Sequence, residues 1–196
     1  MSIVSHFKAR VYAHRARWSA RKILPHITSA DRVLDIGAGD CRLAVRLKEK
    51  ANCTVVPVDV ENFNQTDLKL IMFDGKRLPF EDNSFDAVLL VFVLHHAEDA
   101  KAVLEEARRV SRDRIIVLED VTSSWWDRMM FRGFHHWLVW SEKISYPYHE
   151  NRPHQWTQIA NGLGLTEAAA TPLGRTLGPF SCRHIAFVWQ KKAPAA

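Results

Sequence analysis

A glycine turn flanked by carboxylates is the part of this sequence best suited to chemistry. In the segment Val33-Leu-Asp-Ile-Gly-Ala-Gly-Asp40, Asp35 stands two residues before Gly37. Glycines let the chain turn sharply and let a ligand approach without a Cβ in the way. The start of a helix behind such a turn favours a negative group, whereas Asp35 can accept a hydrogen bond from an ammonium group. The turn therefore predicts a ligand that carries both groups, as an amino acid does.

A second carboxylate, Asp59, ends the next β-rich run about twenty residues further on, where an acid can hold the hydroxyls of a ribose. A dinucleotide-dependent dehydrogenase would place an acid similarly, so Asp59 alone does not discriminate. The dinucleotide fingerprint, however, needs a third glycine at the position of Arg42, and an acid at the position of Asp35 is unusual in that class. An NAD-dependent oxidoreductase is therefore disfavoured.

The elements that must position these residues alternate between strand and helix. Helices are expected over 3–24, 41–50 (with Asp40 as its cap) and 98–110. Strand-like runs occupy 32–36, 54–58, 68–72, 85–94, 114–119, 166–171 and 184–190. This alternation predicts a single α/β domain over 1–196. Its core would be a Rossmann-like, doubly wound, mostly parallel seven-stranded sheet with helices on both faces. Ligands in such sheets bind at the carboxyl ends of the strands.

Four segments occur in an order and spacing that resemble the successive motifs of class I S-adenosylmethionine (SAM)-dependent methyltransferases. They are VLDIGAGDCRLA, VVPVDV, FDGKRLPFEDNSFDAVLLVFVLHHAED and LEEARRV. The resemblance covers about residues 32–120. It is to the small-molecule group that includes the ubiquinone- and menaquinone-type methyltransferases (methyltransferase type 11), and it implies SAM as the cofactor. One departure is Arg109–Arg114, which replaces the family's usual Pro-Gly-Gly and puts the edge of the sheet in doubt.

The resemblance also implies which residues bind the cofactor. They are Asp35, Gly37, Ala38, Gly39, Asp59, Val60, Asp74, Gly75, Val91 and Phe92. Among them, Asp35 would hold the methionine end, Asp59 the ribose and Val60 the adenine ring. Asp74 would accept a bond from the adenine amino group, although an acid before a glycine can equally belong to a turn.

Methyl transfer needs an aligned nucleophile and a dry site rather than a metal, and the sequence shows no cluster of metal ligands. His95 and His96 follow the fourth strand, where the acceptor enters, and are the candidate catalytic residues. The same dipeptide is common in the family with varied substrates, so a direct role does not follow from it. Glu119 and Asp120, after the fifth strand, either face the substrate or solvate the strand end.

An aromatic segment over 121–156 is the expected lid or substrate segment. Placed on a helix, its apolar residues cover most of the circumference, which is more than a surface helix requires. A lid over an apolar acceptor, shallow insertion into a membrane, and packing on the sheet or in a dimer each explain the excess. The candidate substrate contacts are Trp126, Met130, His136, Tyr146 and Tyr148.

The net charge of +5 is concentrated at the start of the chain, because residues 1–30 contain six lysines or arginines and no acid. This basic helix can lie on a membrane or meet an anionic substrate, can be a transit peptide, or can simply be a solvated first helix. No apolar run reaches the roughly 18 residues that span a bilayer. Three scattered cysteines indicate a reducing compartment. We therefore expect a cytoplasmic protein, soluble or peripheral at a membrane.

Together these features predict a methyltransferase for a small, hydrophobic acceptor that is aromatic, quinone-like or a lipid. Nucleic acid is not expected as a partner, because Val93-Leu-His-His96 lacks the Pro-Pro-aromatic pattern and the positive charge lies on one helix. The alternative is a non-catalytic SAM-binding or membrane-surface protein. Residues 1–30 and 125–140 are the candidate membrane contacts, and the chain is expected to be a monomer or a homodimer.

Overall fold

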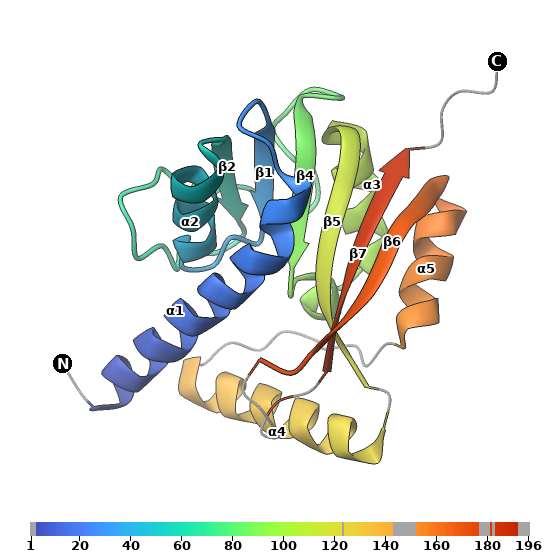
Figure 1. The fold of residues 1–196 in the computed structure, drawn as a ribbon. Coiled ribbons are helices and arrows are strands. Elements are labelled where there is room, and N and C mark those ends of the chain that lie inside the picture. Colours follow the sequence, from blue (N-terminus) through green and yellow to red (C-terminus); the bar gives the residue numbers. More distant parts are fainter. Residues whose placement is uncertain (1–2, 123, 143–151, 177–180, 182, 192–196) are drawn as a thin grey trace.

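A central sheet organises the computed structural model, which describes residues 3–122, 124–142, 152–176, 181 and 183–191. Its seven strands follow the order β3-β2-β1-β4-β5-β7-β6 (Figure 1). The first five strands along the chain are parallel, and β7 is antiparallel to both of its neighbours. The order reverses between β1 and β4, which is the switch point where doubly wound sheets bind ligands. The predicted Rossmann-like α/β fold is confirmed.

The strands and helices have the following bounds. The strands are β1 (Arg32–Ile36), β2 (Thr54–Asp59), β3 (Ile71–Met72), β4 (Phe85–Val91), β5 (Ser111–Val121), β6 (Leu165–Gly174) and β7 (Arg183–Lys191). The helices are α1 (Ile3–Ile23), α2 (Arg42–Ala51), α3 (Ala100–Val110), α4 (Trp125–Glu142) and α5 (Pro153–Gly162), with 3₁₀ turns η1 (Leu24–His26) and η2 (Leu94–His96).

Several predicted boundaries differ from the structure for local reasons. The fourth strand ends at Val91, because Phe92 adopts a left-handed φ of 61° and the chain then turns into η2. Asp40 is not the cap of α2. The N-cap is Cys41, which is itself left-handed at φ 61°, and Asp40 accepts from the amide of Arg42 at 3.1 Å instead.

The sheet edge after α3, which the missing Pro-Gly-Gly had put in doubt, is intact, and β5 is longer than predicted. Helix α3 ends at Val110 and β5 begins at the next residue, so the missing Pro-Gly-Gly leaves no turn between them. The third predicted strand, by contrast, shrinks to the pair Ile71–Met72. The sheet edge beside β2 is therefore short, whereas β5 is long enough to pair with β7 along eight residues.

Apolar layers cover both faces of the sheet. Helices α1 and α2 pack on one face, where Ala87 and Leu89 of β4 meet them, and α3 and α5 pack on the other, against Val88 and Leu90. A strand that is apolar on both faces is what a buried parallel strand requires. Trp156 of α5 is fully buried in the second layer. None of the helices within the described residues has the length and hydropathy needed to cross a bilayer.

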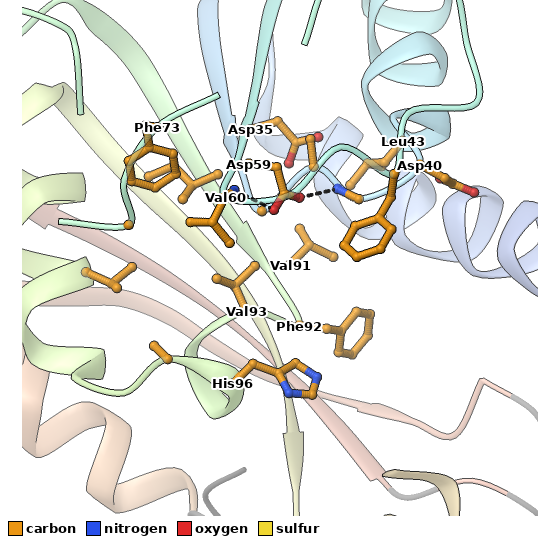
Figure 2. A pocket seen from close by; sticks show the side chains of 18 of the residues that line it. Asp35, Asp40, Leu43, Asp59, Val60, Phe73, Val91, Phe92, Val93 and His96 are labelled. Atoms are coloured by element: carbon orange, nitrogen blue, oxygen red, sulfur yellow. Dashed lines mark hydrogen bonds between the residues drawn. The ribbon is translucent and has the colours of Figure 1, made fainter. Parts of the chain in front are cut away.

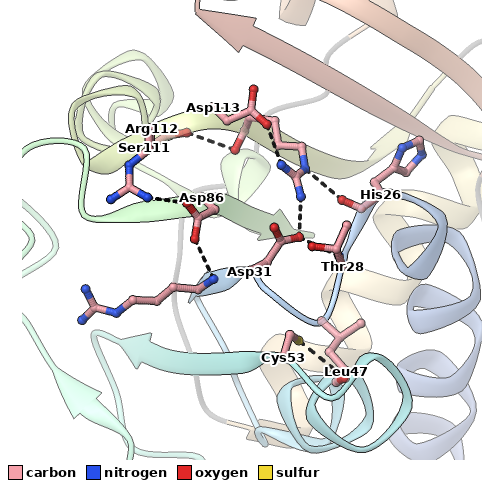
Figure 3. A network of polar contacts seen from close by, with 11 residues as sticks. His26, Thr28, Asp31, Leu47, Cys53, Asp86, Ser111, Arg112 and Asp113 are labelled. Carbon is pink, nitrogen blue, oxygen red and sulfur yellow. Dashed lines mark hydrogen bonds and ion pairs between the residues drawn. The ribbon is translucent and has the colours of Figure 1, made fainter.

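The amino-terminal edge of the sheet is closed by polar contacts (Figure 3). Asp31 pairs with Arg114, whose Nε donates to the carbonyl of His26 at 2.8 Å. Asp86 accepts from the amide of Arg32 at 2.8 Å and from Arg112 at 2.6 Å. These contacts join β1, β4 and β5 to each other and satisfy both acids, so this edge is structural. The opposite edge carries the candidate site.

Candidate functional site

A cavity of about 1140 Å³ lies at the carboxyl ends of β1, β2 and β4 (Figure 2). All ten residues predicted to bind the cofactor line it: Asp35, Gly37, Ala38, Gly39, Asp59, Val60, Asp74, Gly75, Val91 and Phe92. One face of α1 completes the wall. Because most single ligands occupy pockets of about 300–1,000 Å³, this cavity has room for a cofactor and a small second molecule.

The glycine turn is locked by the neighbouring strand. The amides of Gly37 and Ala38 donate to the carbonyl of Val58 at 2.9 and 3.1 Å, and the amide of Gly39 donates to Asp59 at 2.8 Å. Gly37 has a φ of 69°, and a Cβ there would lie 2.5 Å from a methyl group of Val93. These three amides of the turn therefore already donate hydrogen bonds within the chain. The turn lets a ligand approach the backbone closely, but these amides are not free to donate to it.

Asp35 is a buried carboxylate with an oxygen that needs a partner. Its side chain is 1% exposed, and its Oδ2 has no hydrogen-bond partner among the described residues. Burial, together with the negative charges of Asp59 and Asp40, raises the pKa of Asp35 to about 7. Buried polar groups are rarely left unpaired, and a buried charge needs a counter-charge. An ammonium group fits this position, so the donor set agrees with the amino-acid end of SAM.

Asp59 ends β2 and is held by backbone amides. Its Oδ1 accepts from Val60 at 2.7 Å and Glu61 at 3.3 Å, and its Oδ2 accepts from Gly39. Burial outweighs these three bonds and raises the pKa of the carboxyl. Oδ2 retains a lone pair for a ribose hydroxyl, whereas Oδ1 can take a second hydroxyl only if the long bond from Glu61 is given up. The sequence predicted the ribose contact but not that Asp59 also fixes the glycine turn.

Asp74 serves as a turn acid and also lines the cavity. Its Oδ1 accepts from the amides of Lys76 and Arg77 at 2.9 and 3.0 Å, and these bonds lower its pKa. Because both bonds end on Oδ1, the other oxygen can serve a ligand. A Cβ on Gly75 would lie 3.2 Å from Val60, so this glycine makes room for a residue predicted to pack on adenine.

The two candidate catalytic histidines occupy different places. His96 lines the cavity beside Phe92 and Val93 (Figure 2). His95 does not line it: its side chain is 2% exposed and its Nδ1 lies 2.5 Å from Oε2 of Glu119. The prediction that His95 acts directly is therefore corrected, because it lies behind the wall of the cavity. It can act only by holding its neighbours.

Glu119 organises the loop that carries both histidines. It is fully buried and accepts from the amides of Val93 and Leu94 at 3.0 and 2.7 Å as well as pairing with His95. Burial disfavours the charged imidazole of His95, but the charge of Glu119 and their hydrogen bond prevail and raise its pKa. Glu119 therefore neither faces the cavity nor solvates the strand end, the two roles expected from the sequence.

Asp120 has a histidine partner of its own, on β7. Its Oδ1 lies 2.6 Å from Nδ1 of His184, and the Oγ1 of Thr176 lies 2.9 Å from the other ring nitrogen. Burial alone would raise the pKa of Asp120, but the bond to His184 and nearby positive charge lower it. The His184 ring also packs edge-on against Phe92, with ring centroids 5.2 Å apart. No local pattern predicts this pair, because its members are far apart along the chain.

The predicted substrate contacts do not gather at the cavity within the described residues. Trp126 and Met130 lie on α4 and do not line the cavity, and His136 is exposed. Tyr146 and Tyr148 lie outside the described residues. Within the described residues the structure does not bring Trp126, Met130 or His136 to this cavity, so their contact with a substrate stays a prediction.

Helix α1, and not the aromatic segment, supplies the helical wall of the cavity within the described residues. Its contributing residues are Ala9, Tyr12, Arg15, Ala16 and Ser19. The guanidinium carbon of Arg15 lies 4.1 Å from the centre of the Phe92 ring, a cation–π contact. The residues of α1 that line the cavity recur every three or four positions, and several of them are small. This pattern in the sequence could have predicted that one face of α1 lines the cavity. In the described part of the chain, no three His, Cys, Asp or Glu side chains cluster as metal ligands would.

Part of this chain is similar to known methyltransferases. Residues 34–114 match the family model described as a methyltransferase domain. A demethylmenaquinone methyltransferase from Mycobacterium sp. (strain KMS) is 39% identical over 99 residues, which are 47% of this chain and 43% of that protein. The ubiquinone/menaquinone biosynthesis C-methyltransferase UbiE from Stenotrophomonas maltophilia (strain R551-3) is 29% identical over 131 residues, 57% and 52% of the two chains. The chain thus spans about half the length of the curated relatives it matches.

A solved structure of a SAM-dependent methyltransferase from Thermotoga maritima has a TM-score of 0.69 at 18% identity and covers 96% of both chains. At this identity the likeness shows the fold, which is the Rossmann-like fold of class I methyltransferases. Residues 34–114 therefore match a methyltransferase domain, and the chain shares its fold with a solved SAM-dependent methyltransferase. Because one fold hosts many activities, the reaction must be argued from the site.

Proposed function

We propose that this chain transfers a methyl group from SAM to a small, hydrophobic acceptor. The observation that carries the proposal is the unpaired, buried Oδ2 of Asp35, a residue that lines a cavity large enough for two molecules beside a glycine turn. SAM, when bound, supplies the electrophilic methyl group and its own leaving group. The work left to the protein is to hold the cofactor, orient the acceptor and exclude water.

The cofactor end of the cavity is assigned to the carboxyl ends of β1 and β2. Asp35 would hold the ammonium group, and Oδ2 of Asp59 would accept from a ribose hydroxyl. Val60 and Asp74 would contact the adenine, with Gly75 leaving space for that ring. Each of these side chains lines the same cavity, and two of them are buried acids whose pKa values are raised by burial.

The acceptor end is assigned to η2, Phe92 and the facing side of α1. Phe92, Val93 and Ala97 give this end an apolar surface, and His96 and Arg15 add polar groups to it. An aromatic or quinone-like acceptor suits such a surface, and the names of the relatives, demethylmenaquinone and ubiquinone/menaquinone methyltransferases, support it. His96 would contact the acceptor there, and it would take a proton if the nucleophile carries one at neutral pH.

A labelling experiment tests the proposal. The purified chain is incubated with methyl-labelled SAM and menadiol, a small quinol, and in parallel with an organic extract of bacterial lipids. The expected result is label in a small, organic-soluble product, and its loss in Asp59→Ala. Binding of SAM without any transfer would favour the non-catalytic alternative, and absence of binding would refute the site. A cytoplasmic location and a monomeric or homodimeric state remain predictions that accompany this proposal.

A further inference from the structure

Helix α4 presents an aromatic and cationic face to solvent. Trp125 is 73% exposed and Trp126 42%, and Arg128 and Arg132 are also exposed. Trp125, Arg128, Met129 and Arg132 together line a hollow of about 320 Å³. Residues three and four apart share one side of a helix, so these four form a continuous strip. We call this strip the α4 face.

The one acid between residues 124 and 141 is turned away from the α4 face. Asp127 is fully buried, and its Oδ1 lies 2.5 Å from Nη2 of Arg175. Its Oδ2 accepts from the hydroxyl of Ser124 at 2.8 Å and lies 3.9 Å from Nε of Arg183. These contacts anchor the first turn of α4 to the ends of β6 and β7. They fix which side of the helix faces outward, and they keep this acid off the α4 face.

Helix α1 carries a second positive strip, made of Arg10, Arg17 and Arg21. These three arginines are exposed and share one side of the helix, opposite the buried Ala20 and Ile23. In Figure 1, α4 and the amino-terminal half of α1 lie at the same end of the molecule, beyond the carboxyl ends of the parallel strands. The cavity opens at that edge of the sheet too. The α4 face and Arg10 therefore lie at the end of the molecule that holds the site, whereas Arg17 and Arg21 belong to the carboxyl-terminal half of α1.

The composition of the α4 face fits a lipid bilayer with negatively charged head groups. Tryptophan favours the boundary between head groups and acyl chains, and arginine binds phosphate oxygens with paired N–H donors. Single exposed apolar residues are ordinary on protein surfaces, but a strip of tryptophan, methionine and arginine without an acid is the pattern of interfacial helices.

We propose that the α4 face, assisted by Arg10 of α1, docks this protein on an anionic phospholipid bilayer. Docking would bring the edge of the sheet that holds the cavity close to the surface where a hydrophobic acceptor is dissolved. The docking stands on the surface chemistry alone, whereas its use in delivering the acceptor rests on the proposed function.

Vesicle binding tests the docking. The full chain is mixed with vesicles of phosphatidylcholine containing phosphatidylglycerol, and with vesicles of phosphatidylcholine alone, and the bound fraction is measured by co-sedimentation. We expect binding to the anionic vesicles, a blue shift of tryptophan fluorescence on binding, and weakening with salt. The double variant Arg128→Gln/Arg132→Gln should bind about 20-fold more weakly, since each arginine near an anionic surface contributes about fivefold. Trp125→Ala should weaken binding and remove part of the fluorescence shift.

A matched control removes the same charge elsewhere. Lys48 and Lys50 are exposed on α2, and the variant Lys48→Gln/Lys50→Gln should stay within about twofold of the wild type. An equal loss in this control would overturn the proposal by showing attraction to net charge alone. So would absence of wild-type binding to anionic vesicles. Competition by inorganic phosphate at constant ionic strength would assign the arginines to a free anion instead.

Two further readouts separate the remaining outcomes. If sedimentation shows a wild-type dimer that Trp125→Ala dissociates, and anionic vesicles are not bound, the α4 face belongs to a second copy of the chain. Calorimetry with S-adenosylhomocysteine, the demethylated product of SAM, should give the same affinity for the α4 variants as for the wild type. Vesicle binding without cofactor binding would refute the proposed function and leave the docking intact. Cofactor binding without vesicle binding would refute the docking and leave the proposed function intact.

Discussion

Buried acids end three strands at the carboxyl edge of this sheet, but they are used in two different ways. At the ends of β1 and β2, Asp35 keeps an unpaired oxygen and Asp59 is held by backbone amides. At the end of β5, Glu119 is paired with a histidine from the loop after β4, and Asp120 with one from β7. The first two acids lack a side-chain partner within the described residues, whereas each of the other two is paired with a histidine.

The contrast teaches that an acid at the ligand-binding edge of a doubly wound sheet is not by itself a functional residue. A buried charge without a partner costs several kcal/mol, so the first pair reduces the stability of the free protein and gains its partner from a ligand. Glu119 and Asp120 offset the cost of their burial by pairing with histidines of the same chain, and these pairs hold the loops around the cavity in place. Each of the following variants tests one side of this comparison.

The largest effect is expected from Glu119→Ala. Removing this carboxylate leaves His95 buried without its counter-charge and two amides without their acceptor, so the free energy of unfolding should fall by about 3–5 kcal/mol. Urea unfolding followed by circular dichroism measures it. A loss below about 1 kcal/mol would place Glu119 with the ligand-binding acids.

Asp35→Asn should have the opposite effect on the free protein. The pKa of Asp35 is raised from 3.8 to about 7, so its ionisation weakens the folded state as the pH rises through this range. The full cost is at most about 4 kcal/mol above pH 7 and absent below pH 4. Asp35→Asn should therefore melt at a higher temperature than the wild type at pH 8 and at the same temperature at pH 4. Thermal scans at both pH values, without ligand, would contradict the account if the variant were the less stable protein at pH 8.

Asp59→Ala should reduce the affinity for S-adenosylhomocysteine by about 100-fold. Hydrogen bonds to a charged acceptor contribute about 1.5–3 kcal/mol each, and the variant also frees the amide of Gly39 that shapes the turn. Calorimetry measures the loss, and circular dichroism shows whether the fold survives. Unchanged affinity in a folded variant would remove Asp59 from the cofactor site.

The smallest effect on cofactor affinity is expected from His96→Ala. This histidine belongs to the acceptor end, so S-adenosylhomocysteine should bind within about twofold of the wild type, whereas methyl transfer in the labelling assay should fall. Calorimetry and the labelling assay on the same preparation check both statements. A large loss of cofactor affinity with unchanged transfer would reverse the assignment of the two ends.

The sequence predicted which residues gather at the carboxyl ends of β1, β2 and β4, because the signals for that placement are local. The glycine turn, the acid two residues before it and the acid at the end of the next strand lie in segments whose spacing alone brings them to one edge of a sheet. The ten predicted residues accordingly line one cavity. The pairing of Asp120 with His184 depends on an antiparallel register between β5 and β7 that no local pattern encodes.

The helix that lines the cavity was harder to predict, for a related reason. A helix that is apolar around most of its circumference, such as α4, does not reveal which side will be buried, so Trp126 and Met130 were placed at the cavity. Asp127, through Arg175, fixes that side in the structure. Helix α1 lines the cavity instead, because small residues on one of its faces let it approach closely. This close approach becomes evident only in the packed fold.

The most direct test of this account is a crystal structure of the chain with S-adenosylhomocysteine. The account predicts that the ammonium group of the ligand lies within hydrogen-bonding distance of Oδ2 of Asp35, and that a ribose hydroxyl reaches Oδ2 of Asp59. It also predicts that the sulfur points toward Phe92 and His96. A ligand bound elsewhere, or in the cavity with its ammonium group away from Asp35, would contradict it.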